Sequence, residues 1–316
     1  MRVALVVALV LVMWFPAVGT GQEPQAPPAP RPTFRSSVQR VVIAASVRTR
    51  RGRPVTGLKA TDFTLLDSGI VKPILEFHTD PTPVSVGLLV DFSGSMGVAA
   101  RRAAAYGNAQ QLIGQLTPAV DRAALFVFDK VLRELQPLAP APGDVLAQLQ
   151  AVRSPFGVTS LFDAIAETGN ILARTGGPRR AVVALTDGSD NASTLTPEEV
   201  SALASGIDVP VYVVIVVSPF DAGRGSTVDD ERLDQVLAGP LGNLARWTGG
   251  EIYTGLGTAE ASQVAREVVM DLRQQYLIAF EPEAHPGWHP ITLRTRDASL
   301  VVRTRGGFMV RQPAGL

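Results

Sequence analysis

The stretch "VGLLVDFSGSMGVAA" runs from Val86 to Ala100 and decides the fold. An apolar run leads into Asp91, Ser93 and Ser95 follow at alternate positions, and a run of small residues comes next. A continuous apolar run of this kind is typical of a strand that is buried on both faces of a parallel sheet. The stretch therefore predicts a buried strand that ends in one carboxylate and two hydroxyl groups.

Similar apolar runs recur along the chain and alternate with helical patterns, which predicts a doubly wound α/β fold with a mostly parallel sheet. Lys130–Leu135 follows the second run so closely that we expect it to return antiparallel at an edge of the sheet. The expected strands are Val84–Val90, Ala123–Phe128, Ala181–Leu185 and Pro210–Val217, and the expected helices are Val98–Leu116, Asp144–Val152, Ser160–Ala173, Pro197–Ala204, Leu241–Trp247 and Ala259–Gln275.

Both flanks of this region carry short alternating patterns typical of strands. On the N-terminal side they are "VVIAASV" (41–47), "DFTLLDSG" (62–69) and "VKPILEF" (71–77); on the C-terminal side they are "YLIAFEPE", "HPITLRTR" and "LVVRTRGGFMV". Neither flank alone is long enough to bury a stable core. We therefore expect residues 34–82 and 276–316 to pair into one small β-sandwich, into which the α/β domain, residues 83–275, is inserted.

The N-terminus has the pattern of a secretory signal. Arg2 precedes the apolar run Val3–Trp14, and small residues suited to cleavage follow. The prediction is a signal peptide over residues 1–19, with a retained anchor as the alternative, and a proline-rich linker over residues 20–33. No other segment is apolar enough to span a membrane. A secreted or periplasmic protein is expected, and the absence of cysteine excludes disulfides and thiolate metal sites.

Five oxygen-bearing side chains are expected to meet at one edge of the sheet. Asp91 and Asp187 each follow a strand, and these strands are neighbours if the order is 3-2-1-4-5-6. Thr159 precedes a helix nearby, and Gly94 makes room between Ser93 and Ser95. Hard cations prefer oxygen ligands, so the set predicts a site for Mg²⁺, Mn²⁺ or Ca²⁺. If the uncharged hydroxyls are the direct ligands, the ion is under-neutralised and its open position attracts an external carboxylate.

Three motifs, "DFSGSM" (91–96), "GVTSL" (157–161) and "LTDG" (185–188), resemble the metal-ion-dependent adhesion site of von Willebrand factor type A domains. The resemblance covers residues 84–275, and the flanks are similar to secreted bacterial VWFA-related proteins. It implies that Ser93, Ser95 and Thr159 bind the metal directly, and that Asp91 and Asp187 act mainly through water. The implied function is divalent-cation-dependent protein binding in which the partner presents Asp or Glu. Val158 stands where a glycine is common in the family, which stiffens the loop.

Other functions remain open at this stage. The first loop could merely cap a helix and hold no ion. A hydrolase using Ser93 lacks a Gly-x-Ser-x-Gly elbow, and the three histidines, His78, His285 and His289, lie outside the α/β region. The protein could also be a structural subunit of an envelope assembly, with contacts through the β-sandwich and a metal that only stabilises the fold. A formal net charge of zero argues against nucleic acid as a partner.

Four further features have two interpretations each. "HPGWH" has the spacing of two zinc ligands but is expected to be a proline-rich loop. Asp190 either tunes the site or is a solvated loop residue. The segment "SPFDAGRGSTVDD" (218–230) either shapes partner choice or is an insertion without a role. "DDERLD" (229–234) is expected to be the acidic start of a helix and not a cation site.

Overall fold

The structure is a computed structural model that describes residues 40–80, 82–140, 145–152, 157–175, 177–206, 208–216, 234–255 and 258–310. All of these residues belong to one unit of the chain, residues 38–316. The predicted signal peptide and linker (1–33) and the loop 218–230 lie outside the described residues, as does all but the last residue of "DDERLD".

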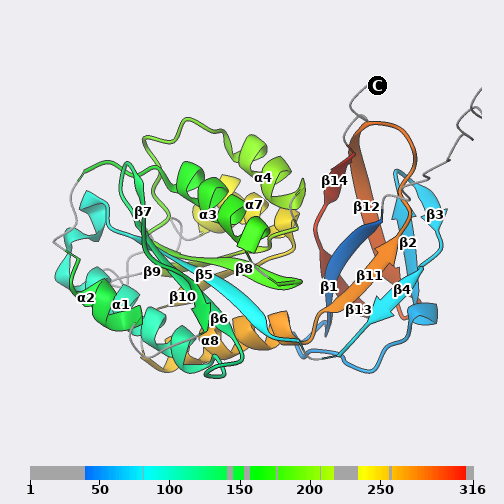
Figure 1. The fold of residues 1–316 in the computed structure, drawn as a ribbon, viewed down its shortest axis with the longest axis horizontal. Helices are drawn as coiled ribbons and strands as arrows, with labels where there is room; N and C mark the ends of the chain where they lie inside the picture. Colours follow the sequence, from blue (N-terminus) through cyan, green and yellow to red (C-terminus); the bar gives the residue numbers. More distant parts are fainter. Residues whose placement is uncertain are drawn as a thin grey trace, which may run out of the picture. The chain divides into compact units, whose positions relative to one another are not determined.

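A six-stranded sheet organises the middle of the chain, with the order β10-β9-β8-β5-β6-β7 (Figure 1). Every neighbouring pair is parallel except β6 and β7, which confirms the predicted antiparallel edge. The adjacency of β5 and β8 is the predicted one, and β10 was not predicted. The strands are β5 (Val84–Asp91), β6 (Arg122–Phe128), β7 (Leu132–Pro140), β8 (Arg179–Thr186), β9 (Val211–Val216) and β10 (Ile252–Gly255).

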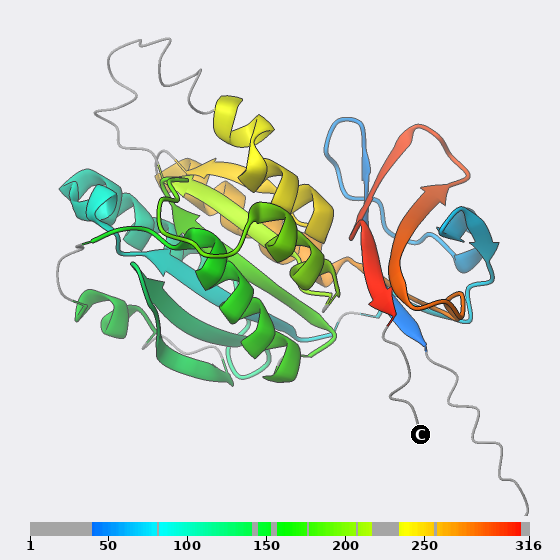
Figure 2. The ribbon, with the colours of Figure 1, turned by 90° about the horizontal axis from the view of Figure 1, so that it is seen from above.

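Helices cover both faces of this sheet, as expected for a doubly wound fold (Figure 2). One face packs against α1 (Ala99–Gly114), α2 (Val145–Gln150) and α8 (Thr258–Arg273), and the other packs against α3 (Leu161–Thr175), α4 (Pro197–Gly206) and α7 (Pro240–Thr248). Both faces of each central strand are therefore buried, which explains why the strands are apolar without alternation.

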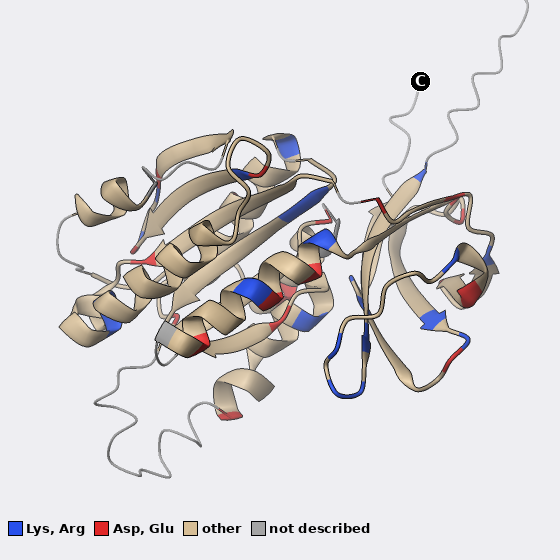
Figure 3. Ribbon diagram, turned by 90° about the horizontal axis from the view of Figure 1, so that it is seen from below, with Lys and Arg blue, Asp and Glu red and all other residues tan. Residues whose placement is uncertain are grey.

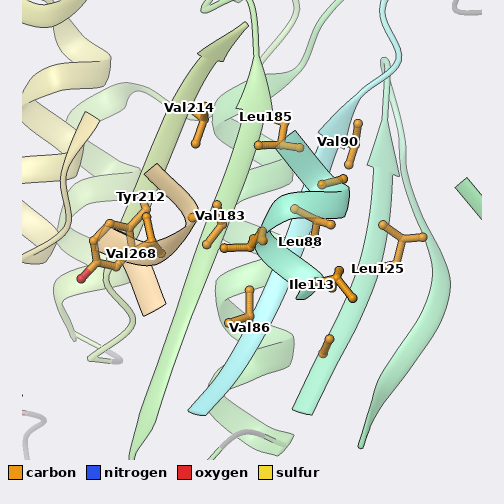
Figure 4. Packing of buried hydrophobic residues seen from close by; sticks show 14 of the residues in the cluster. Val86, Leu88, Val90, Ile113, Leu125, Val183, Leu185, Tyr212, Val214 and Val268 are labelled. Carbon is orange, nitrogen blue, oxygen red and sulfur yellow. The ribbon is translucent and has the colours of Figure 1, made fainter. Parts of the chain in front are cut away.

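The central strand β5 shows how the two cores are divided. Val86, Leu88 and Val90 point to the α1 and α8 face (Figure 4), whereas Leu89 belongs to the opposite core. Each of these fully buried side chains contributes about 1.5–3 kcal/mol of transfer free energy. The strands of the sheet carry few charges, which lie mainly on helices and loops (Figure 3). This burial fixes the direction of β5 and hence the place where Asp91 emerges.

The two ends of the chain form a β-sandwich of two four-stranded sheets, β13-β1-β11-β4 and β14-β12-β2-β3. Each sheet contains strands from both flanks, because β1 pairs with β11 and β12 pairs with β2. This pairing confirms the predicted sandwich. A 3₁₀ turn, η1 (Ala60–Asp62), precedes β2. The strands are β1 (Val41–Thr49), β2 (Phe63–Asp67), β3 (Ile70–Lys72), β4 (Glu76–His78), β11 (Tyr276–Phe280), β12 (Gly287–Thr295), β13 (Leu300–Thr304) and β14 (Gly307–Val310).

Two predicted strands of the sandwich are each divided between its sheets. "VKPILEF" gives β3 and β4 on either side of Pro73, which cannot donate to a strand ladder. "LVVRTRGGFMV" gives β13 and β14, with the change of sheet at Gly306. A Cβ atom at Gly306 would lie 2.9 Å from the ring of Trp247, so the close approach there requires glycine.

Candidate functional site

The first loop of the candidate site follows β5 and contains the short 3₁₀ turn η2 (Gly94–Gly97). Asp91 is buried at the end of the strand, and its Oδ1 accepts a hydrogen bond of 2.8 Å from the backbone N–H of Ser93. Its Oδ2 accepts a hydrogen bond of 2.7 Å from Thr186 Oγ1 on the neighbouring β8. The hydroxyl oxygens of Ser93 and Ser95 lie 3.1 Å apart. The alternation of Asp and Ser therefore brings the two hydroxyls to the same side of the loop.

The second loop carries Thr159 immediately before α3 and is tied to the first. The backbone N–H of Gly94 donates to the carbonyl of Gly157 at 2.9 Å. A Cβ atom at position 94 would lie 3.1 Å from that carbonyl oxygen, so the close approach of the two loops favours glycine there. Val158, the departure from the family pattern, is 42% exposed and lies in the same loop.

The third loop follows β8 and carries Asp187, which is buried. Asp187 Oδ1 accepts a hydrogen bond of 3.1 Å from the backbone N–H of Ser189. Further along this loop, the Asn191 side chain accepts a hydrogen bond of 2.9 Å from the Thr159 N–H, and the Asn191 N–H donates to the Thr159 carbonyl at 3.0 Å. The structure thus joins the three predicted loops at the carboxyl ends of β5 and β8, where a doubly wound sheet places ligands.

Burial raises the pKa of the Asp91 carboxyl above its usual range, and the negative charge of Asp187 adds to this effect. Hydrogen bonds from Ser93 and Thr186 oppose the shift because they favour the ionised form. Burial of an ionised carboxylate without a nearby positive charge is unfavourable in free energy, and a bound cation would offset this penalty.

The donor set fits a hard cation. The residues predicted to hold it offer only carboxylate and hydroxyl oxygens, which are the ligands that Mg²⁺, Mn²⁺ and Ca²⁺ prefer. Thr159 is 2% exposed, and the side chain of Asn191 accepts a hydrogen bond from its backbone N–H. Among the described residues, those of this site included, no group of three or more His, Cys, Asp or Glu side chains could hold a metal ion. A metal here therefore depends on the hydroxyl groups.

Several residues of the site were not predicted. Thr186 bridges the two strands through Asp91, and Arg101 on α1 donates from Nη1 to Asp187 Oδ2 at 3.2 Å and to the carbonyl of Ser95 at 3.0 Å. Thr186 stands directly before Asp187 in the LTDG motif, which was the only sequence signal for it. Nothing in the sequence around Arg101 indicated its contact with Asp187.

Asp190 has a structural role that neither sequence interpretation contained. Its Oδ1 accepts hydrogen bonds from the backbone N–H of Leu161 at 2.7 Å and from Ser193 Oγ at 2.6 Å. Leu161 is the first residue of α3, so Asp190 satisfies a free N–H group at the helix start. The residue fixes the end of the helix next to Thr159.

The "HPGWH" segment is not the predicted loop, because its second half forms the start of β12. His289 is fully buried, with Nδ1 2.9 Å from Asp67 Oδ1 and Nε2 2.7 Å from the His285 carbonyl oxygen. Burial raises the pKa of Asp67, but hydrogen bonds from Glu283 N–H, His289 and Ser68 lower it below the usual range. His78 lies on β4, so the three histidines belong to the β-sandwich and not to the sheet that carries Ser93.

The family comparison agrees with the fold and the loops. Residues 86–189, which contain all three motifs, match the model of the von Willebrand factor type A domain. This part of the chain is therefore a von Willebrand factor type A domain. No curated protein matches it in sequence.

Solved structures with a similar fold share little sequence with this chain. A von Willebrand factor type A protein from Catenulispora acidiphila is 15% identical, covers 88% of this chain and 75% of its own length, and has a TM-score of 0.47. The conserved hypothetical protein BatB from Bacteroides thetaiotaomicron is 19% identical, covers 59% of this chain and 98% of its own length, and has a TM-score of 0.43.

None of the helices among the described residues combines the length and apolarity that a membrane crossing requires.

Proposed function

We propose that this protein is an extracytoplasmic, divalent-cation-dependent protein-binding module. Von Willebrand factor type A domains are generally protein-interaction modules and not enzymes, which supports the class of function. Ser93, Ser95 and Thr159 would hold a Mg²⁺, Mn²⁺ or Ca²⁺ ion directly, and Asp91 and Asp187 would act mainly through water. The ion would supply an open position for an Asp or Glu carboxylate of the partner.

One observation supports this proposal: hydrogen bonds join the loops that carry the proposed ligands at the carboxyl ends of β5 and β8, where Asp91 and Asp187 are buried. The Ser93 and Ser95 hydroxyls lie 3.1 Å apart, and Thr159 is 2% exposed. A loop that only capped α1 would not need Thr159. The extracytoplasmic location rests on the sequence of residues 1–19 alone.

The test compares two threonines of the same region. Thr159→Val removes one proposed ligand without changing the side-chain shape, and Thr168→Val removes a fully buried hydroxyl that has no hydrogen-bond partner in the described part of the chain. Thermal unfolding is measured in EDTA and in Mg²⁺ or Mn²⁺. A cation at ten times its dissociation constant adds about 1.4 kcal/mol, or roughly 3–5 °C for a domain of this size.

The wild type and Thr168→Val should show this cation-dependent shift, and Thr159→Val should lose it. A shift that survives in Thr159→Val, or that is absent in the wild type, would contradict the proposed ligand set. A structural subunit in which the metal only stabilises the fold would show the shift but no metal dependence in binding to partners. Pull-downs with and without chelator, at a temperature where both forms are folded, separate these two functions.

A further inference from the structure

A second cavity, of about 470 Å³, is formed by residues outside the candidate metal site. It is lined by parts of α4 and α7 from the α/β domain and by Trp288 of β12 from the sandwich, and none of the proposed metal ligands lines it. Its lining is mostly apolar. A volume and lining of this kind are typical of pockets for small molecules, which occur preferentially where two domains meet.

Two tryptophans form adjoining walls of this cavity. Trp247 at the end of α7 and Trp288 at the start of β12 both line it, with ring centroids 6.4 Å apart and ring planes at 37°. Trp247 is 50% exposed, so a large part of its indole surface is open to a ligand. Among the aromatic side chains, indole attracts cations most strongly through its π face.

The backbone between β13 and β14 holds both rings in place. The N–H of Gly306 donates to the carbonyl of Trp247 at 2.7 Å. A Cβ atom at Gly306 would lie 2.9 Å from the Trp247 ring, and one at Gly307 would overlap the ring of Trp288. Both indoles therefore pack closely against this backbone, which restricts their rotation before any ligand binds. A preformed pair of rings loses little conformational entropy on binding.

The lining of the cavity carries a negative charge. Glu198, on the first turn of α4, is the only charged residue among the described residues that line it, and Glu199 adds a second carboxylate on that turn. Arg246 on α7 is not among the lining residues, and its guanidinium donates to Asn243 Oδ1 at 2.6 Å and to the Leu237 carbonyl at 3.3 Å. Two indoles beside a carboxylate favour an organic cation, because both kinds of group attract positive charge and the rings also bury methyl groups.

We propose that this cavity binds a small organic cation, a quaternary ammonium compound of the choline type, at Trp247, Trp288 and Glu198. The two indoles supply apolar surface and π faces, and the carboxylate supplies the opposite charge. A neutral molecule of the same shape would make the apolar contacts but not the electrostatic ones. The cavity uses no residue of the proposed metal site, so either site can be refuted without the other.

The test uses the fluorescence of the two tryptophans. The chain has three tryptophans, so Trp14→Phe in the full chain leaves Trp247 and Trp288 as the only ones. Choline chloride is titrated and compared with the uncharged alcohol in which carbon replaces the choline nitrogen, and with sodium chloride at equal ionic strength. Glu198→Gln removes the charge of the lining, and Glu199→Gln on the same turn is the matched control. Circular dichroism confirms that each variant is folded.

Choline should change the fluorescence saturably and should bind about fivefold or more tightly than the uncharged alcohol, as a cation–π contact predicts. Glu198→Gln should weaken choline binding about threefold, and Glu199→Gln should leave it unchanged. Trp288→Leu, or Trp247→Leu if the first variant unfolds, should abolish choline binding.

Three results would overturn the proposal. The first is equal affinity for choline and the uncharged alcohol, which would indicate an apolar pocket without preference for charge. The second is a response to choline no larger than the response to sodium chloride. The third is choline binding that survives the loss of a tryptophan ring or that is weakened equally by Glu198→Gln and Glu199→Gln.

Discussion

Asp271 offers a strong test of how α8 is anchored. This buried residue on α8 contacts Arg48 of β1 and Arg303 of β13, with 3.1 Å between Asp271 Oδ1 and Arg48 Nη2. Its Oδ2 also accepts a hydrogen bond of 2.6 Å from Tyr212 Oη on β9. One carboxylate therefore connects the sheet, the helix and the sandwich strands. Although burial lowers the pKa of Arg303, the charge of Asp271 raises it above its usual value.

The perturbation is Asp271→Asn, which keeps the shape and removes the charge. Removal of one partner of a buried ion pair costs about 3–5 kcal/mol. The side chains of Arg48 and Arg303 are 17% and 15% exposed, so water offsets part of the loss. We therefore expect the low end, about 3 kcal/mol, which corresponds to a decrease of roughly 6–12 °C in melting temperature.

The assay is thermal unfolding followed by circular dichroism, with Glu260→Gln on the exposed start of α8 as the control for loss of a helix carboxylate. Asp271→Asn combined with Arg303→Met should cost less than the sum of the single changes, because the two residues share one interaction. A melting temperature of Asp271→Asn equal to that of Glu260→Gln would refute the reasoning. So would strict additivity in the double variant.

Two further predictions concern the α/β domain. Gly87→Ala places a Cβ atom 2.8 Å from Leu172 Cδ1 in the core, so it should lower the free energy of unfolding in urea by about 1–3 kcal/mol. The control, Gly107→Ala on α1, meets no atom within 4 Å and should be neutral or stabilising. Equal stabilities of the two variants would contradict the packing of β5 on α3. Burial raises the pKa of Asp121, but hydrogen bonds from backbone N–H groups and from Arg273 lower it below its usual value, so its ionised form stabilises the fold above the unfolded pKa. The stability difference between wild type and Asp121→Asn should therefore be full near pH 7 and shrink as the pH falls below about 4, and a constant difference would exclude the shift.

The sequence predicted most of the elements, the neighbours of β5 and the pairing of the two flanks, but not how the sandwich strands are divided between its two sheets. The strand that ends at Asp91 was visible because burial on both faces leaves a continuous apolar run. β10 was missed because four residues in a half-buried edge strand carry little pattern. The division of "VKPILEF" between two sheets was missed because hydrophobic alternation does not specify which sheet a strand joins. Pro73 indicated where the strand is interrupted, but not that β3 and β4 join different sheets.

Some residues of the candidate site could be located from a general rule of the fold, and others only from the way the helices pack. Asp91 and Asp187 could be brought together from sequence, because parallel strands that are neighbours in a doubly wound sheet end at the same edge. The contact between Arg101 and Asp187 could not be predicted. The two residues are 86 positions apart, and the contact depends on the direction in which the start of α1 presents its third residue. The sequence therefore predicts a site with two negative charges, whereas the structure has one of them paired. The guanidinium of Arg101 therefore changes the charge beside the predicted ligands, and this change could be found only from the position of α1 next to the loop that carries Asp187.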